Sequence, residues 1–198
     1  MNIALYGPKH SGKTSVARYL SHAHHYERVG LADPVKDSAV YMLNQWFRYM
    51  GVERTITRGE LDRGKDQHFV PFLQWLGTDW ARQYLDMDDI WIRRFLDVSI
   101  DGEAHYVCDD LRFPNEADAL RLEGFAIIRV SRDENDRLHS LARANAGGIP
   151  GHASETLMDG ITPDYTVSGT TLDALYRDVE RVMHAIFSPR ENFYAARG

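Results

Sequence analysis

The sequence predicts an α/β fold with a central parallel sheet of about five strands and helices on both faces. Three observations support this prediction. Short apolar segments alternate with helical segments, a glycine-rich turn follows the first apolar segment, and polar residues cluster where apolar segments end. Strands that are buried on both faces are short, continuous apolar runs, as these segments are. The length of 198 residues fits one domain, residues 1–198.

Strands and helices alternate along most of the chain. We expect strands at 2–6, 26–30, 105–108, 126–131 and 165–167, and helices at 12–22, 33–50, 114–123, 134–146 and 172–187. Asp33 is expected to cap the second helix, because Pro34 follows it and proline favours the first helical turn. We read the polar residues 51–68 as a loop. Residues 69–100 have a helical pattern with an expected break around 76–79.

Composition limits the partners and the compartment. The chain has 23 Lys and Arg against 29 Asp and Glu, a net charge of −6 that disfavours nucleic acid without excluding a local basic groove. The one cysteine, Cys108, excludes a disulfide within the chain and favours a reducing compartment. No stretch resembles a signal peptide or approaches the roughly 18 apolar residues of a membrane helix. We therefore expect a cytoplasmic protein without membrane contact.

Residues 7–14 read Gly-Pro-Lys-His-Ser-Gly-Lys-Thr and match the phosphate-binding pattern Gly-x-x-x-x-Gly-Lys-Thr between a strand and a helix. Glycines allow several backbone N–H groups to face a phosphate, and the new helix presents its positive end. Lys13 adds a charge near the β- and γ-phosphates, and the Thr14 hydroxyl is an expected Mg²⁺ ligand. We expect the side chains of Lys9 and His10 to be exposed rather than catalytic. The predicted ATP-binding residues are Gly7, Lys9, His10, Ser11, Gly12, Lys13 and Thr14.

The class of phosphate-binding protein can be narrowed. GTPases need a base-reading Asn-Lys-x-Asp and transporter ATPases a Leu-Ser-Gly-Gly signature; neither occurs here, and the chain is short for a helicase. A compact small-molecule kinase remains. Asp109 and Asp110 follow the central strand, and one of them, with Asp110 favoured, is expected to hold Mg²⁺ through water. Arg112 binds the acceptor phosphate or pairs with Glu116.

Four further motifs occur in the chain. Residues 31–36 read Leu-Ala-Asp-Pro-Val-Lys, and 73–82 read Leu-Gln-x-Leu-Gly-Thr-Asp-x-x-Arg, with Trp91 downstream. Residues 110–117 read Asp-Leu-Arg-Phe-Pro-Asn-Glu-Ala, and 152–155 read His-Ala-Ser-Glu. With the phosphate-binding loop, these motifs resemble the bacteriophage deoxynucleoside monophosphate kinases over about residues 3–175. The resemblance implies an adenylate-kinase-like P-loop fold with a helical acceptor-binding insert and a lid.

The resemblance also implies roles for individual residues. The acceptor part spans about 34–100 and the lid about 132–155. Arg82 is expected on the acceptor monophosphate, and arginines of the lid neutralise the transferring phosphoryl group. The implied catalytic residues are Lys13, Asp110, Arg112, Arg132 and Arg137, and the metal ligands are Thr14 and Asp110. The implied acceptor-binding residues are Lys36, Gln74, Asp79, Arg82, Trp91 and Glu155.

The expected reaction transfers the ATP γ-phosphoryl group to a deoxynucleoside 5′-monophosphate with Mg²⁺. Two alternatives stay open at this point. One is a kinase of a modified base within DNA, which needs a basic groove and shows salt-sensitive DNA binding. The other is a non-catalytic nucleotide-binding module, which the intact Lys13, Thr14 and Asp110 disfavour. The sequence leaves the oligomeric state open, a homodimer included.

Overall fold

The computed structural model describes residues 1–63, 69–100, 104–132 and 157–188. The helix expected at 134–146 lies outside these residues. In chain order the elements are β1 (Asn2–Tyr6), α1 (Lys13–His24), β2 (Glu27–Val29), α2 (Asp33–Tyr49), α3 (Arg58–Arg63), α4 (Phe69–Gln74), the π-helix η1 (Trp75–Tyr84), α5 (Ile90–Ser99), β3 (Tyr106–Cys108), α6 (Pro114–Leu122), β4 (Phe125–Ser131), the 3₁₀-helix η2 (Leu157–Gly160), β5 (Tyr165–Ser168) and α9 (Leu172–Phe187). None of the described helices has the length and apolarity needed to cross a bilayer.

The five strands form one parallel sheet in the order β2-β3-β1-β4-β5. β1 lies in the centre, where Ile3 is paired with Val107 of β3 on one side and with Ala126 of β4 on the other. The predicted fold class, a parallel sheet with helices on both faces, is confirmed. Because parallel strands end at the same edge of a sheet, the segments that follow β1 and β3 meet there.

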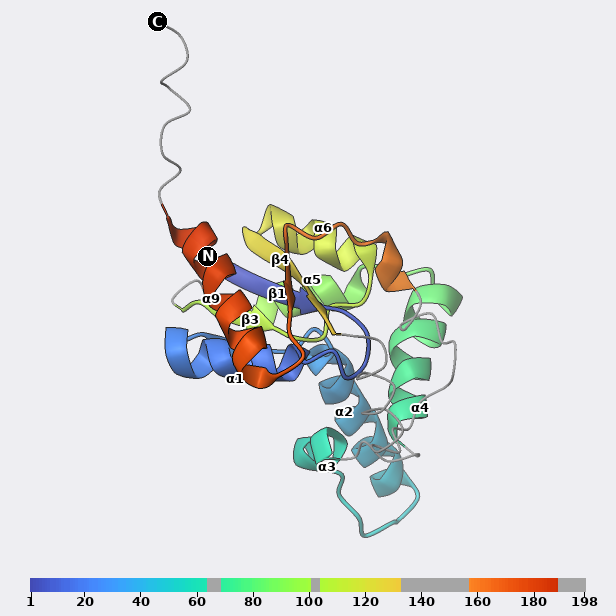
Figure 1. Ribbon diagram of the computed structural model, residues 1–198. Helices are drawn as coiled ribbons and strands as arrows, with labels where there is room; N and C mark the ends of the chain where they lie inside the picture. Colours follow the sequence, from blue (N-terminus) through green and yellow to red (C-terminus); the bar gives the residue numbers. More distant parts are fainter. Residues whose placement is uncertain (64–68, 101–103, 133–156, 189–198) are drawn as a thin grey trace, which may run out of the picture.

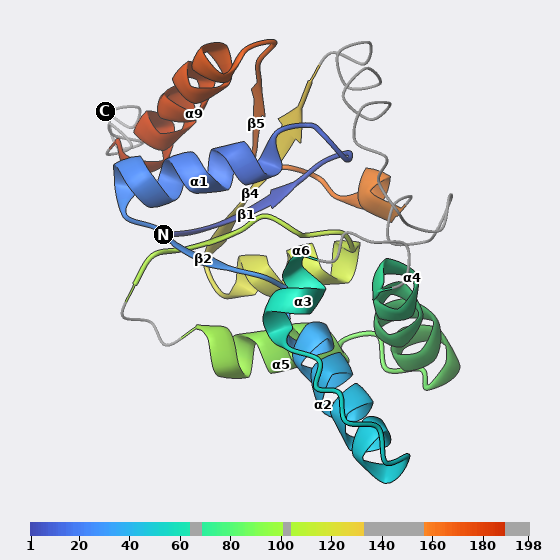
Figure 2. The same ribbon diagram turned by 90° about the horizontal axis from the view of Figure 1, so that it is seen from below.

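Alternate side chains of β1 enter two different cores. Ile3 and Leu5 pack on the face covered by α1 and α9, whereas Ala4 and Tyr6 pack on the face covered by α5 and α6. Figures 1 and 2 show these two helical layers on opposite sides of the sheet. The period-two alternation of a strand therefore explains why β1 is apolar along its length.

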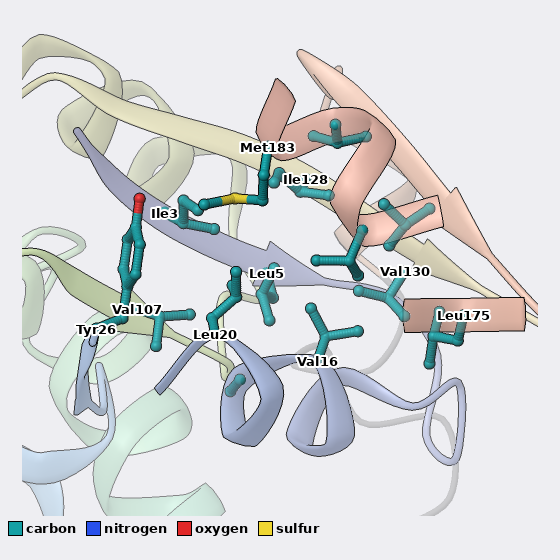
Figure 3. Packing of buried hydrophobic residues seen from close by; sticks show 14 residues of the cluster. Ile3, Leu5, Val16, Leu20, Tyr26, Val107, Ile128, Val130, Leu175 and Met183 are labelled. Atoms are coloured by element: carbon teal, nitrogen blue, oxygen red, sulfur yellow. The ribbon is translucent and has the colours of Figure 1, made fainter. Parts of the chain in front are cut away.

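The core beneath α1 and α9 fixes the start of α1. Figure 3 shows Val16 and Leu20 of α1 beside Leu5, with Leu175 and Met183 of α9 closing the same cluster. All five side chains are at most 4% exposed. The turn that connects β1 to α1 is therefore anchored at both ends by buried residues.

A third core lies in a helical part beside the sheet. It contains Val35 and Ala39 from α2, Leu76 and Ala81 from η1, and Trp91 from α5. Figure 2 shows α2 and α4 extending away from the sheet, with α3 against α2. This helical part occupies the segment for which the sequence predicts acceptor binding.

Two local expectations were wrong between residues 30 and 63. The segment 51–68, read as a loop, contains helix α3, whose Arg58 forms ion pairs with Asp33 and Asp37 of α2. Asp33 is the first residue of α2 rather than its cap, and its carboxylate accepts a hydrogen bond from the Gly30 N–H at 2.9 Å. The ion pairs of Arg58 join residues more than 20 positions apart, whereas the Asp33 bond to Gly30 is local.

The helical break expected at 76–79 was also wrong. The chain passes from α4 into η1 without interruption, and the break comes later, between Tyr84 and Ile90. A Cβ added at Gly77 would lie 3.3 Å from Cγ1 of Val35, so this glycine allows α2 and η1 to pack closely. Gly77 thus serves helix packing and does not end the helix.

Candidate active site

The turn after β1 requires glycine at its first position. Gly7 has φ +143°, and a Cβ there would lie 2.2 Å from the carbonyl oxygen of Val130 in the neighbouring strand β4. Gly12, with φ +106°, precedes the first residue of α1. Positive φ and close backbone contact both exclude side chains, so the two glycines of the phosphate-binding pattern have a physical cause here.

Lys13 folds back over this turn. Its Nζ donates hydrogen bonds to the carbonyl oxygens of Gly7 at 2.7 Å and Pro8 at 2.8 Å. The ammonium group is therefore held at the loop by neutral acceptors. Such acceptors can exchange for phosphate oxygens, which form stronger charge-assisted hydrogen bonds. Thr14, the next residue, is exposed at the start of α1.

Two other loop residues differ from expectation in exposure. Lys9 and His10 are half-buried rather than exposed, and His10 has the positive φ of 63°. Ser11 is 2% exposed, and its Oγ meets no hydrogen-bond partner within the described residues. Every residue from 7 to 13 is thus buried or half-buried.

Asp110, which follows β3, binds the backbone just before α2. Its Oδ1 accepts the Leu31 N–H at 2.8 Å, and its Oδ2 accepts the Ala32 N–H at 2.9 Å. The Cys108 thiol donates to the same Oδ1 at 3.1 Å. A carboxylate offers about four acceptor positions, so these three donors leave room for a water molecule or metal-bound water. Burial raises the pKa of the Cys108 thiol well above its usual range.

Asp109 has a different partner. Its Oδ2 lies 3.2 Å from Nη2 of Arg28, which projects from β2. The pair is partly exposed, with 39% of the arginine side chain and 17% of the aspartate side chain accessible. The two neighbouring carboxylates therefore differ, since Asp110 binds backbone groups and Asp109 binds one surface arginine.

A small hollow of about 50 Å³, partly open to solvent, lies between the turn and the segment after β3. It brings together Lys13 from the turn with Asp110 and Arg112 from the other side, as the sequence predicts for a site at the carboxyl ends of parallel strands. Gly12, His10, Ser11 and Thr14 are not among its lining residues. The residues that line it are Gly7, Lys9, Lys13, Asp109, Asp110, Leu111, Arg112 and Met158.

Arg82 and Glu116 form an ion pair beside this hollow. Nη2 of Arg82 lies 2.5 Å from Oε1 of Glu116, and the two residues are 6% and 4% exposed. Nη1 of Arg82 donates to the carbonyl oxygen of Asp88 at 2.9 Å, and the guanidinium lies 4.1 Å from the ring centre of Phe113. Burial raises the pKa of the Glu116 carboxyl, an effect that Arg82 and the Arg112 and Phe113 backbone N–H groups oppose.

Four further predicted acceptor residues, Lys36, Gln74, Asp79 and Trp91, lie in the helical part and do not line the hollow. Nζ of Lys36 is 2.8 Å from Oδ1 of Asp62, and Nε1 of Trp91 donates to the carbonyl oxygen of Gly77 at 2.8 Å. Trp91 is 7% exposed, so it belongs to the helical core. Two more, Gln74 in α4 and Asp79 in η1, are half-buried.

The predicted lid is described only at its first residue. Arg132 follows β4 and is half-buried. Arg137 and Glu155 lie outside the described residues, as does the rest of 133–155.

Sequence reasoning missed several residues near the site. Arg28 and Met158 were not singled out, although one pairs with Asp109 and the other lines the hollow. Arg58 was assigned to a loop, yet its spacing of four from Asp62 is the local signal of a helix ion pair. Glu116 was considered only as a partner of the Arg112 side chain, whereas it accepts the Arg112 backbone N–H.

Comparison with known proteins fits this geometry. No protein-family model matches the chain. A protein of Acanthamoeba polyphaga mimivirus described as "Putative deoxynucleotide monophosphate kinase" is 31% identical over 143 residues, covering 66% of this chain and 73% of the viral protein. The chain belongs to the deoxynucleotide monophosphate kinase family. The kinase family assignment makes the protein a nucleotide-dependent phosphotransferase.

Two solved structures resemble this family member in fold. A sugar kinase from a Janibacter species has a TM-score of 0.53 and 14% identity, with 93% of each chain covered. A Thermus thermophilus protein has the same TM-score and 17% identity, with 96% of this chain and 98% of that chain covered. At this identity the likeness concerns the fold alone.

Proposed function

We propose that the protein transfers the γ-phosphoryl group of ATP to the 5′-monophosphate of a deoxynucleoside, giving ADP and the diphosphate. The observation that carries this proposal is the hollow where Lys13 of the turn faces Arg112 of the segment after β3. Two cations on opposite walls can bind two phosphate groups, the γ-phosphate of ATP and the acceptor monophosphate, which must come into contact for transfer. The viral relative's description supports a deoxynucleotide acceptor.

In the proposed reaction an oxygen of the acceptor phosphate attacks the γ-phosphorus of ATP, and the bond to the β–γ bridging oxygen breaks. ADP leaves with that oxygen. The acceptor phosphate is already an anion, so the chain needs no strong general base and acts by positioning and charge stabilisation. Lys13 leaves the Gly7 and Pro8 carbonyls for the β- and γ-phosphates, and backbone N–H groups of the turn, other than at Pro8, bind the same phosphates. Arg112 neutralises charge on the transferring group.

The oxygen donors near the hollow suit a magnesium ion. Mg²⁺ prefers oxygen ligands and keeps several waters, so one or two protein oxygens are sufficient. Thr14 presents an exposed hydroxyl, and Asp110 retains an acceptor position beside its three donors. Thr14 and Asp110 would hold the ion, which would supply positive charge that lowers the cost of negative charge accumulating on the phosphates.

The acceptor nucleoside is assigned to the helical part, residues 34–100. Lys36 and Gln74 lie on the two helices, α2 and α4, that extend from the sheet, and Asp79 follows on η1. Trp91 supports this part from its core. The lid is assigned to residues 132–155, where Arg132 and Arg137 approach the phosphates when substrates bind.

The test is a substrate panel with wild-type protein. Each common deoxynucleoside and ribonucleoside monophosphate is incubated with ATP and Mg²⁺, and ADP release and the nucleoside diphosphate are both measured. We expect turnover of at least one deoxynucleoside monophosphate and none without acceptor. A parallel arm offers double-stranded DNA with modified bases. Labelled phosphate in DNA alone indicates a DNA-base kinase, and ATP binding without any transfer indicates a binding module.

A further inference from the structure

The ion pair between Arg82 and Glu116 connects the helical part to the wall of the hollow. Arg82 comes from η1, and Glu116 lies in the first turn of α6, just after Arg112. Arg82 also binds the Asp88 carbonyl oxygen, and Nδ2 of Asn115 donates to the same oxygen at 3.0 Å. Three chain segments therefore meet at one buried charge pair.

The two oxygens of Glu116 have separate tasks. Oε1 binds the guanidinium of Arg82, while Oε2 accepts the backbone N–H groups of Arg112 and Phe113, both at 3.2 Å. Arg112 is one of the residues that line the hollow. The position of its main chain thus depends on a carboxylate whose orientation Arg82 sets.

Arg82 is poorly placed to bind a substrate directly. Its side chain is 7% exposed, lies over the Phe113 ring and does not line the hollow. If Arg82 turned toward a phosphate, the charge of Glu116 would remain buried without its partner. Breaking a buried pair in this way costs about 3–5 kcal/mol. A contact with the acceptor monophosphate, implied for Arg82 by the family resemblance, would have to offset that cost.

We propose that Arg82 and Glu116 are a positioning pair that holds the main chain of Arg112 in place for phosphoryl transfer, and that neither side chain touches the substrates. This inference rests on the proposed function. It goes beyond the capping box that Glu116 forms with Phe113, a motif in which either glutamate or glutamine serves at the third helical position. Here a glutamine in place of Glu116 cannot satisfy both neighbours, because its NH₂ group would face either the guanidinium or the two backbone N–H groups.

The first experiment is a cycle of Glu116→Gln, Arg82→Met and the double variant. We expect Glu116→Gln to lower kcat by about 10²-fold, because a displacement of about 1 Å in an active site has this effect. In the double variant the guanidinium is absent, so the introduced glutamine can turn its oxygen to the N–H groups of Arg112 and Phe113. Its kcat should recover to within about tenfold of wild type, since an apolar replacement of a buried ion pair is often tolerated. A double variant as impaired as Arg82→Met, with a raised KM for the monophosphate, would show that Arg82 binds substrate and overturn the proposal.

The second experiment tests whether the pair acts through Arg112. Glu116→Gln is repeated in an Arg112→Ala background. We expect it to change kcat there by no more than about twofold, because the effects of two residues that act through one another do not add. An undiminished loss of kcat in that background would contradict the proposal, because Glu116 would then act on something other than Arg112.

Two controls keep the inference testable if a variant fails to fold or if the substrate assignment is wrong. Arg82→Lys keeps a positive charge beside Glu116 and should therefore retain most of kcat. If Arg82 instead bound the acceptor phosphate through two hydrogen bonds, this substitution would raise the KM for the monophosphate by more than about tenfold. Amide hydrogen exchange at Arg112 and Phe113 needs no substrate. Both amides should be protected in wild type, lose protection in Glu116→Gln and regain it in the double variant. Unchanged protection throughout would refute the positioning role, while a wild type without kinase activity would refute only the proposed function.

Discussion

The two walls of the hollow are held in place by different means. The turn of residues 7–12 depends on close backbone packing at Gly7, with Lys13 bound to two main-chain carbonyls. The segment after β3 depends on carboxylates, since Asp110 and Glu116 each bind two backbone N–H groups. One wall thus contains a lysine cation bound to the carbonyls of a shaped loop, and the other, the fixed wall, is a segment whose backbone is held by carboxylates. Such preorganisation lowers the cost of stabilising charge in the transition state.

Removing the Lys13 cation should have the largest effect. Lys13→Ala is expected to lower kcat by about 10³-fold or more, the scale found for cations that stabilise phosphoryl transfer. The free energy of unfolding should fall by only about 1–2 kcal/mol, because the bonds of Nζ to Gly7 and Pro8 are two part-buried hydrogen bonds to neutral carbonyls. Kinetics with saturating ATP and urea unfolding measure the two effects.

Arg18→Ala is the matched control for Lys13→Ala, since Arg18 is an exposed cation on the same helix α1. It should leave kcat within about twofold of wild type, as surface changes far from a site do. A Lys13→Ala enzyme with near-normal kcat would mean that the turn is not the ATP site. The difference between the two walls would then have no consequence for catalysis.

The shape of the turn is tested by Gly7→Ala. The added methyl group meets the Val130 carbonyl oxygen at 2.2 Å, and the residue must hold φ +143°. Backbone strain and overlap together should cost about 3 kcal/mol or more. Gly51→Ala is the control, because Gly51 also has a positive φ, +69°, but its Cβ would have nothing within 4 Å. The control should lose about 1–2 kcal/mol. Equal losses in urea unfolding would show that contact with β4 does not shape the loop.

The fixed wall is tested by comparing its two neighbouring carboxylates. Asp110→Asn removes one acceptor oxygen and leaves an N–H of Leu31 or Ala32 facing an NH₂ group, which should cost about 1–3 kcal/mol of stability. Asp109→Asn weakens only the partly exposed pair with Arg28 and should cost about 0–1 kcal/mol. Chemical denaturation of both variants gives the difference. If the Asp109 variant loses more stability, carboxylate–backbone bonds are not what fixes this wall.

Much of the fold could be predicted because it follows from local patterns. The apolar runs of β1 and β4 and the glycine turn between β1 and α1 lie where the sequence places them. Wrong expectations concern long-range contacts. Helix α3 is stabilised by the ion pairs that Arg58 forms with α2, and Gly77 permits helix packing on Val35, neither of which a periodicity can show.

The candidate site, like the fold, could be predicted where it follows from local motifs and not where it depends on long-range contacts. Lys13, Asp110 and Arg112 were chosen by motif and strand ends, and the structure brings them to one hollow. Their roles, like those of Lys36 and the lid arginines, stay predictions. The Arg82–Glu116 pair joins residues 34 positions apart, and only a folded chain shows that Glu116 accepts the backbone N–H of Arg112.

The smallest expected effect concerns the base of the fixed wall, where the Cys108 thiol donates to Asp110. Burial raises the pKa of this thiol, so the folded chain keeps its proton when the unfolded chain, with a thiol pKa of about 8.5, releases it. The folded state then binds more protons, and stability falls as pH rises, by up to about 1.4 kcal/mol per pH unit above 8.5. Burial also raises the pKa of Tyr26 to about 12, which matters only near pH 10 and above. Urea unfolding at pH 8 and 9.5 should show this loss of stability in wild type. It should not appear in Cys108→Ser, whose hydroxyl still donates to Asp110 without titrating. The same dependence of the free energy of unfolding on pH in both proteins would mean that the fixed wall opens to solvent in the native state.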